Sequence, residues 1–206
     1  MMVAAKSRRA PGRRERLLAA AAELFFEQGY AATSIDAIIE RAGGSKRNIY
    51  NEFGNKEGLF AAIVSTSAEK ALSSLVIDEI EGRHLRDILI AFGHQLMTIY
   101  MSPALIGIYR TIVAEASRYP DLGQKFYQSG PDRATNRLAE VLEAAKARGE
   151  IHTDDCIRTA GHFVALIRDN VHLQVVLALR PAPDEKEMQE AVLSAVNLFL
   201  NGVEPR

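Results

Sequence analysis

Apolar residues recur along this chain every three or four positions, which is the spacing of one face of an α-helix. The first such stretch starts at Arg13, continues through Leu17 and Leu24, and meets a helix-ending glycine at Gly29. Further along the chain, the same period predicts five long helices, over 84–101, 103–118, 121–148, 154–179 and 184–201. Gly130 and Pro131 are expected to break or kink the third of these. No segment alternates with the period of two that strands require, so the pattern predicts an all-α protein.

Polar residues that typically begin helices divide the region after the first helix into short pieces. Thr33 is predicted to be the N-cap of a short second helix, with Asp36 completing a capping box. Asn55 is predicted to cap a longer helix that continues to near Ile80. Free backbone N–H groups at these two helix starts could bind phosphate, and Lys56 would add a positive charge beside the second start.

A short helix between these two is predicted to begin after Ser45 and to face inward through Ile49 and Phe53. Its outward positions carry hydrogen-bonding side chains: Lys46, Arg47, Asn48 and Asn51. Two short helices joined by a glycine turn form a helix-turn-helix, whose second helix enters the major groove of DNA. Arg47 could pair with guanine and Asn48 with adenine, each discriminating by about 1–3 kcal/mol. The alternative for Arg47 is a solvated surface charge.

The distribution of charge favours a polyanionic partner for the N-terminal part. The net charge is −1, yet residues 1–60 contain ten Lys/Arg against seven Asp/Glu, and the remainder contains fifteen against nineteen. Basic residues gather before position 17: Lys6, Arg8, Arg9, Arg13, Arg14 and Arg16. Residues 1–12 are small, basic and aperiodic, so a disordered basic arm is expected there.

Composition argues against several other classes of protein. No apolar run approaches the roughly 18 residues of a membrane span. The first residues do not resemble a signal peptide, so a cytoplasmic protein without a membrane partner is expected. Cys156 is the single cysteine, which excludes an internal disulfide and a multi-cysteine zinc site. We expect a buried inert thiol there, with oxidant sensing as the alternative, and we expect no metal or cofactor.

Motifs in two regions carry a resemblance to a known family. The DNA-binding domain of the tetracycline-repressor (TetR) family is similar to RRERLLAAAAELFFEQGYAATSIDAIIERAGGSKRNIYNEFGNKEGLFAAI, through the elements LF…GY, TS…I, RAG.SK, IY..F and NKE.LF. The AefR-like C-terminal domain of that family is similar to IYRTIVAEASRYPDLGQKFYQSGP, followed by ARGE and DNVHLQVVLAL.

The resemblance implies a plan for the whole chain. It implies a three-helix DNA-binding domain over 13–60, and a helical effector-binding and dimerisation domain over 61–206. A homodimer would place two recognition helices roughly 34–36 Å apart, or a multiple of that distance, on a palindromic operator in double-stranded DNA. The implied function is a transcriptional repressor that a small-molecule effector releases from its operator. By position, Thr33, Tyr50 and Lys56 would hold phosphates, while Ser45, Lys46, Arg47, Asn48 and Asn51 would line the recognition helix. The alternative for Tyr50 is a core aromatic residue.

The turn between the two short helices departs from the family pattern. Ile39 stands where the family usually has a small residue, and Gly44 stands where it has a valine-like one. We therefore expect the Ile39 side chain to fill the space vacated at Gly44. Arg47 and Asn48 stand where the family more often has a small residue and threonine, which indicates a different operator preference.

The helices over 84–101 and 103–118 are apolar nearly all round, so they are expected to be central. The family resemblance implies that the effector pocket lies between them. The candidate lining residues are Phe92, Gln95, Leu96, Tyr100, Tyr109, Ile112, Phe126, Tyr127 and Phe163. Plain core packing is the alternative for each of them. Arg110 and Arg168 could orient a ligand with Gln95, although Arg110 could equally pair with Asp169 or Glu115.

The last two long helices are expected to form the dimer interface as a four-helix bundle. One seam would contain Ala160, Val164, Ile167, Val171, Val175 and Ala178. The other would contain Val192, Ala195, Val196 and Phe199.

Two alternatives belong to other classes. An enzyme is favoured only by Glu81-x-x-His84, a spacing found in di-iron bundles that need a second such motif and two more glutamates. Gly82 within it argues for a loop, so we expect no catalytic activity. A DNA-binding dimer without an effector is the second alternative, and a pocket closed by side chains would favour it.

Overall fold

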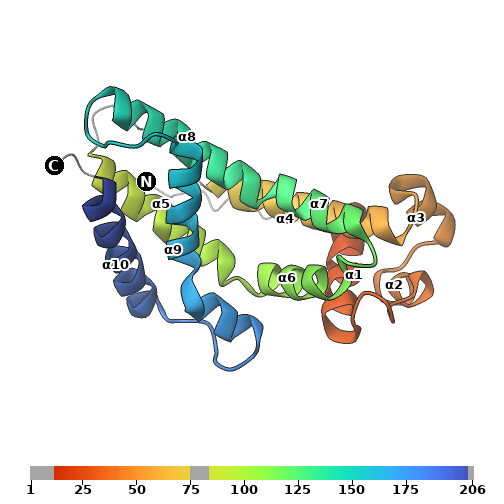
Figure 1. Cartoon of the computed structure of the whole chain (residues 1–206). Coiled ribbons are helices and arrows are strands. Elements are labelled where there is room, and N and C mark those ends of the chain that lie inside the picture. The colour runs from red at the N-terminus through yellow and green to blue at the C-terminus, as the bar shows by residue number, and fades with distance from the viewer. Residues whose placement is uncertain (1–11, 75–83, 204–206) are drawn as a thin grey trace, which may run out of the picture. The chain divides into compact units, whose positions relative to one another are not determined.

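The computed structural model describes residues 12–74 and 84–203, which contain ten helices and no strand (Figure 1). The helices are α1 (Arg13–Gln28), α2 (Ile35–Ala42), α3 (Lys46–Phe53), α4 (Lys56–Ser74), α5 (Leu85–Tyr100), α6 (Pro103–Glu115), α7 (Pro120–Ser129), α8 (Pro131–Ala147), α9 (Cys156–Val176) and α10 (Glu185–Val203). The all-α prediction is confirmed. Residues 1–11 of the predicted arm, the predicted continuation of α4 to Ile80, and Glu81 lie outside the described residues.

The chain forms two compact units, divided inside α4 after Ile63. The first unit contains α1, α2, α3 and the start of α4. Its centre is a triangle of aromatic rings, Phe25, Tyr30 and Phe60, whose centroids lie 5.2–5.5 Å apart. Such offset and edge-to-face contacts stabilise a core beyond the burial of area alone. Around this triangle the short helices α2 and α3 are held through one fully buried isoleucine each, Ile38 and Ile49.

Side-chain caps begin three helices of the first unit, α2, α3 and α4, but one predicted cap was wrong. Ser45 Oγ accepts from the Asn48 N–H at the start of α3, and Asn55 Oδ1 accepts from the Gly58 N–H at the start of α4. At the start of α2 the cap is Ser34 instead of Thr33, because Ser34 Oγ accepts from the Ala37 N–H at 3.1 Å. The Thr33 hydroxyl points into the unit instead.

The expected exchange of volume between Ile39 and Gly44 was also wrong. A Cβ at Gly44 would meet no atom within 4 Å, so the Ile39 side chain does not fill that space. Gly44 has φ of +119°, and Gly43, which ends α2, has φ of +76°. L-residues rarely adopt these conformations, so both glycines are explained by the backbone of the turn and not by packing.

The second unit contains the rest of α4 and α5–α10, with α5 packed between α9 and α10, and α8 against α9. Its core is a single cluster of buried residues that includes Leu89, Phe92, Leu138 and Phe163. At Gly93, an added Cβ would lie 2.9 Å from Ile167 Cδ1 and from Val192 Cγ1, so the glycine permits a close approach of α5 to both neighbours.

Two interruptions shape the second unit. The predicted break at Gly130 and Pro131 divides α7 from α8, with Pro131 in the first turn of α8 where its missing N–H costs nothing. Helix α9 contains a kink that the sequence pattern did not predict, because Asp169 has φ of 41° and ψ of −175°. Positive φ is uncommon for residues other than glycine and marks local strain.

Within the described residues, no individual helix is long and apolar enough to cross a membrane, and only α5 and α6 taken together, bent by 66°, pass that test. Cys156 is buried, and burial raises the pKa of its thiol. A protonated buried thiol is a poor nucleophile, so the inert interpretation of Cys156 is favoured over oxidant sensing.

Candidate DNA-binding surface and ligand cavity

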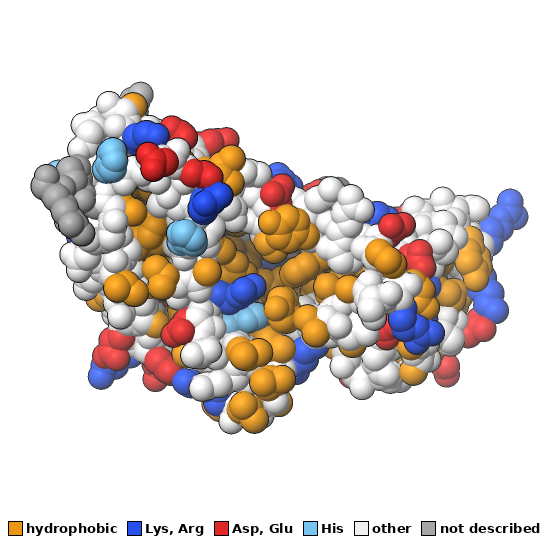
Figure 2. Space-filling view, in the orientation of Figure 1, with side chains coloured by type: hydrophobic (Ala, Val, Ile, Leu, Met, Phe, Trp, Pro, Cys, Tyr) orange, Lys and Arg blue, Asp and Glu red, His pale blue; other side chains and the backbone are white. Residues whose placement is uncertain are grey.

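Helix α3 has one buried face and one polar exposed face. Ile49 is 1 % exposed and anchors the helix, while Phe53 one turn later is half-buried under the Arg14 guanidinium. The opposite face carries exposed Arg47 and Asn51, with half-buried Asn48 beside them. In Figure 2, Lys and Arg side chains protrude around α2 and α3. A packed short helix with an amide and guanidinium face has the form needed to contact base edges in a major groove.

The charged side chains of α3 differ in how they are held. Lys46 forms an ion pair with Asp36 of α2, with Nζ 2.9 Å from Oδ2, and this carboxylate raises the pKa of the Lys46 ammonium. No hydrogen bond or ion pair among the described residues engages the Arg47 guanidinium, which leaves all its donors available. Tyr50 is 49 % exposed, so the alternative of a core aromatic residue was wrong.

Two predicted phosphate contacts are corrected, because their polar groups bond within the first unit. Thr33 is 1 % exposed, and its hydroxyl donates to the carbonyls of Leu24 and Gly29 at 3.1 and 2.8 Å. Lys56 Nζ donates to the carbonyls of Tyr30, Ala31 and Thr33 at 2.8, 3.3 and 3.2 Å. The ammonium also lies 4.4 Å from the centre of the Tyr30 ring. Lys56 therefore ties the start of α4 to the turn before α2.

The junction between α3 and α4 requires a glycine. A Cβ built at Gly58 would lie 1.9 Å from the Phe53 carbonyl oxygen, which is a backbone atom. Asn55 adds the cap described above, and Gly54 ends α3 with φ of +79°. These local constraints orient α3 relative to the start of α4 within the first unit.

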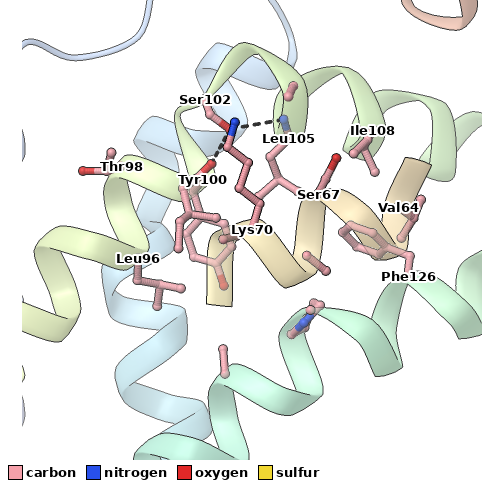
Figure 3. Close-up of a pocket in the computed structure, with 17 residues that line it drawn as sticks. Val64, Ser67, Lys70, Leu96, Thr98, Tyr100, Ser102, Leu105, Ile108 and Phe126 are labelled. Carbon is pink, nitrogen blue, oxygen red and sulfur yellow. Dashed lines mark hydrogen bonds between the residues drawn. The ribbon is translucent and has the colours of Figure 1, made fainter. Parts of the chain in front are cut away.

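The second unit contains a largely apolar cavity of about 440 Å³, close in size to many ligand pockets (Figure 3). Helices α4 to α8 contribute to its wall. The lining residues are Val64, Ser67, Ala68, Lys70, Ala71, Leu96, Thr98, Ile99, Tyr100, Ser102, Ala104, Leu105, Ile108, Phe126, Gly130, Pro131 and Ala134. In Figure 2, hydrophobic side chains border a hollow on this face of the second unit, between α6 and α8.

Three of the nine predicted pocket residues line this cavity: Leu96, Tyr100 and Phe126. The other six lie elsewhere. Phe92, Ile112 and Phe163 are buried in side-chain packing, Tyr109 packs against Phe126 behind the wall, Tyr127 is 59 % exposed, and Gln95 borders a separate surface depression beside His94. For Phe92 and Phe163 the alternative of core packing describes their positions, since the two rings pack together with their centroids 6.3 Å apart.

The polar groups of the cavity wall fall into two kinds. Ser102 Oγ accepts from the Leu105 N–H and donates to the Ile99 carbonyl, and Thr98 donates to the His94 carbonyl. Neither the Lys70 ammonium nor the Tyr100 hydroxyl has a hydrogen-bond partner among the described residues. Burial raises the pKa of Tyr100 to about 12, so its hydroxyl remains a protonated donor at neutral pH.

A histidine that the sequence analysis did not select lies directly behind this wall. His172 is 3 % exposed, with its ring centroid 5.6 Å from that of Tyr100 and 5.0 Å from that of Tyr109. Within the part of the chain that the structure describes, its Nε2 has no hydrogen-bond partner. Burial, with a smaller contribution from the positive charge of Arg168, lowers the pKa of His172 to about 4, so the ring is neutral near pH 7. The sequence signal that could have identified it is its place between the apolar residues Val171 and Leu173 of α9.

Arg110, considered as a ligand contact or as a partner of Asp169 or Glu115, is bonded differently. Its Nε donates to the Val176 carbonyl at 2.7 Å and its terminal nitrogen to the Val175 carbonyl at 2.8 Å. It therefore donates to backbone carbonyls at the end of α9, of which the Val175 carbonyl also accepts from the Ala178 N–H at 3.0 Å. Both expected carboxylate pairings were wrong.

Comparison with known proteins assigns the family. The profile for bacterial regulatory proteins of the tetR family matches residues 17–63, and the profile for the C-terminal domain of AefR-like transcriptional repressors matches residues 87–202. This chain belongs to the TetR family. It is therefore a DNA-binding transcriptional regulator, as the resemblance implied.

Individual relatives share this organisation. The transcriptional regulator UidR of Escherichia coli K12 is 29 % identical over 150 residues, which is 68 % of this chain and 70 % of UidR. The solved structure of the flavonoid-responsive regulator FrrA is 32 % identical, with a TM-score of 0.80 over 94 % of this chain and 98 % of FrrA. A TetR regulator from Agrobacterium tumefaciens is 25 % identical, with a TM-score of 0.74 over 95 % of this chain and 96 % of its own.

TetR-family regulators dimerise. Four of the ten predicted seam residues were wrong, because Ala160, Ile167, Val192 and Val196 are fully buried within the protomer's own core. Of the others, Ala178 is exposed, and Val164 and Val171 are half-buried. The large apolar side chains that α9, α10 and the turn after α9 expose are Ile157 at 61 %, Leu173 at 52 %, Leu177 at 58 %, Leu179 at 71 % and Leu198 at 63 %.

Proposed function

We propose that this TetR-family regulator is a repressor that binds a palindromic operator through α3 and is released when a small molecule occupies the cavity of the second unit. The observation that carries the proposal is the combination of an unpaired, exposed Arg47 on a packed recognition helix with an open apolar cavity in the same chain. As a DNA-binding protein it would act in the cytoplasm, on the bacterial chromosome.

The DNA-binding half of the proposal rests on the exposed face of α3. Arg47 and Asn51 lie one turn apart on that face, and Asn48 is beside them. Arginine pairs bidentately with guanine, and asparagine with adenine. Tyr50 and the basic residues before α1 would contact the phosphate backbone of the DNA. Such contacts position α3 without selecting a base sequence. Lys46, held by Asp36, would contribute mainly charge.

Helix α4 offers a route from ligand to DNA-binding unit because it belongs to both units. Its first turns carry Lys56, bonded to three carbonyls of the first unit, and the buried Leu59 and Phe60. Its later turns carry Ser67, Ala68 and Ala71 in the cavity wall. A ligand that displaces these later turns would act on the same helix that carries Lys56. Such a ligand alters operator affinity only to the extent that it binds the two arrangements unequally.

The proposed dimer uses the exposed apolar side chains of α9 and α10. Isolated exposed residues are ordinary on a monomer, but Ile157 and Leu198 lie on two adjacent helices and would be covered by a second copy. The two-fold axis of such a dimer would match the axis of a palindromic operator. Leu198→Glu is expected to yield monomers in analytical ultracentrifugation, and an unchanged dimer would exclude this face.

The two alternatives from other classes are weakened by specific observations. A regulator without an effector would be expected to fill its core, yet a cavity of about 440 Å³ remains. The relative FrrA is flavonoid-responsive, which supports a small-molecule effector for this member too. The enzyme alternative is disfavoured because the relatives of this chain are transcriptional regulators.

Selection of bound duplexes from a random pool tests the function. The expected result is an enriched inverted repeat whose half-sites are one DNA turn apart, or a multiple of one turn. Salt should weaken binding steeply, because phosphate contacts release counterions. A pool that shows no enrichment at low ionic strength would overturn the proposal.

A further inference from the structure

We propose that the cavity of the second unit selects small apolar molecules that carry one anionic group, a carboxylate being the simplest, and that Lys70 binds this group. The inference rests on the proposed function, because it gives the chemical class of the effector. It goes further in assigning a recognition role to Lys70, an exposed residue of α4 that the sequence analysis did not select.

The apolar lining of the cavity predicts that the body of the ligand is apolar. Leu96, Ile108 and Phe126 supply apolar surface from three different helices, and alanines of α4, α6 and α8 leave the volume open. The walls cannot hydrogen-bond a polar body, so burying one there would cost desolvation without compensation. An alkyl or aryl body instead gains from burial in proportion to its apolar area.

The polar end of the ligand follows from the polar side chains of the wall that have no hydrogen-bond partner among the described residues: the Ser67 hydroxyl, the Lys70 ammonium and the Tyr100 hydroxyl. Lys70 is the one residue in the cavity lining, as the structure describes it, that carries a formal charge. Its ammonium has no partner among the described residues, while the hydroxyls of Ser102 and Thr98 donate to backbone carbonyls. In Figure 3 the Lys70 side chain extends from α4 toward the turn at Ser102. No carboxylate lies in the described lining to neutralise it.

A second donor in the wall is the Tyr100 hydroxyl, from α5. Its raised pKa, about 12, keeps it a hydrogen-bond donor to an anion or to a carbonyl. A cavity with an ammonium, a phenolic donor and no acidic group in its described lining favours an acceptor-bearing anion over a cation. A cationic ligand would meet the like charge of the exposed Lys70, which disfavours its binding.

Three compounds of equal chain length test this assignment: decanoate, decan-1-ol and decylamine, measured by isothermal titration calorimetry at pH 7. The wild-type protein is expected to bind decanoate about tenfold more tightly than decan-1-ol, a difference typical of one charge-assisted contact, and decylamine most weakly. In Lys70→Met, the affinity for decanoate should fall about tenfold, to that of decan-1-ol. The affinity for decan-1-ol should not change. Lys70→Glu should reverse the order and favour decylamine.

Lys125→Met is the matched control, because Lys125 is an exposed lysine of the second unit that does not line the cavity. It should leave all three affinities unchanged. Decan-1-ol binding as tightly as decanoate in the wild type, no binding of any of the three, or equal effects of Lys70→Met and Lys125→Met would each overturn the assignment.

The operator measurement separates this inference from the proposed function. Operator affinity without ligand should be the same for wild type, Lys70→Met and Lys125→Met, since Lys70 lies in the second unit. If an enriched operator is found but decanoate neither binds nor weakens operator binding, the ligand class is wrong while the DNA-binding function stands. If no operator is enriched, the proposed function itself is wrong.

Discussion

The two units of this chain differ in where their polar groups without protein partners lie. In the first, the hydroxyl of Thr33 and the ammonium of Lys56 are fully used inside the fold, and the unpaired polar groups point outward from α3. In the second, the interior holds an apolar cavity, and among the described residues the buried Nε2 of His172 and Oε2 of Glu115 have no hydrogen-bond partner.

This difference follows from what each unit must contact. Base edges are rigid and external, so a recognition helix must be held firmly by its own core. A ligand that enters a fold needs volume and polar groups that the protein has not already used. Buried polar atoms without partners are costly and uncommon, and they are found where a protein stores strain or keeps a function. Asp169, with its strained backbone, lies on the same helix as His172.

The largest expected effect breaks the packing of the first unit. Gly58→Ala would place Cβ 1.9 Å from the Phe53 carbonyl, a backbone atom that cannot rotate away. We expect the first unit to lose about 3 kcal/mol or more, which outweighs the gain of about 1 kcal/mol that alanine normally brings to a helix. Calorimetry should show its transition lowered and operator binding weakened.

Gly93→Ala is the counterpart in the second unit. Its added Cβ would lie 2.9 Å from the tips of the Ile167 and Val192 side chains, which can shift. The loss should therefore be smaller, about 1–2 kcal/mol. A larger loss of stability for Gly93→Ala than for Gly58→Ala would contradict the claim that the first unit is the less able of the two to accommodate an added Cβ.

The second prediction concerns the buried histidine and pH. The pKa of His172 is lowered from 6.5 to about 4 in the folded protein, so between these values the unfolded chain binds the extra proton. Stability attributable to His172 is therefore complete above pH 6.5 and falls as pH decreases toward 4, by up to about 3 kcal/mol. The groups that face it are the rings of Tyr100 and Tyr109 and the charge of Arg168.

His172→Phe keeps a ring between the two tyrosines and removes the titration. Urea unfolding at pH 7 and pH 4.5 should show a smaller loss of stability in the variant than in the wild type. Equal losses in both proteins would mean that this histidine is not the neutral buried group described.

The third prediction concerns Lys56, for which the family resemblance and the structure disagree. Lys56→Met keeps the apolar stem but removes the three hydrogen bonds to backbone carbonyls. We expect a loss of about 2 kcal/mol in the stability of the first unit, with the salt dependence of DNA binding unchanged. A phosphate contact would instead lower the slope of log K against log salt by about 1 and leave stability intact.

Local signals made most of the first unit predictable. The caps at Ser45 and Asn55, the inward Ile49 and the outward Arg47 all follow from residues within one or two turns. Thr33 and Ser34 are adjacent residues able to cap, and only the contact of Thr33 with Leu24, nine positions away, decides between them. The three carbonyls around Lys56 come from residues 23–26 positions away, which no local pattern encodes.

The second unit was predictable in its helices but not in its cavity. Helical period predicts which residues are apolar on a face, and Phe92 and Leu96 share such a face, yet Phe92 packs against Phe163 while Leu96 borders empty space. A cavity is a failure of surrounding side chains to fill volume, which depends on several helices at once. For the same reason the sequence pattern did not show that Ala160, Ile167, Val192 and Val196 are buried within the protomer.

The most direct test of the central claim is the base preference of Arg47→Ala, measured by selection from a random duplex pool beside Arg133→Ala. Arg133 is also an exposed arginine, on α8 of the second unit, so both variants lose one positive charge. We predict that Arg47→Ala relaxes the preference at one position of each half-site by about 1–3 kcal/mol while thermal stability stays within about 0.5 kcal/mol. Arg133→Ala should leave the enriched motif unchanged. An identical motif for wild type and Arg47→Ala would contradict the claim that the exposed face of α3 selects the operator.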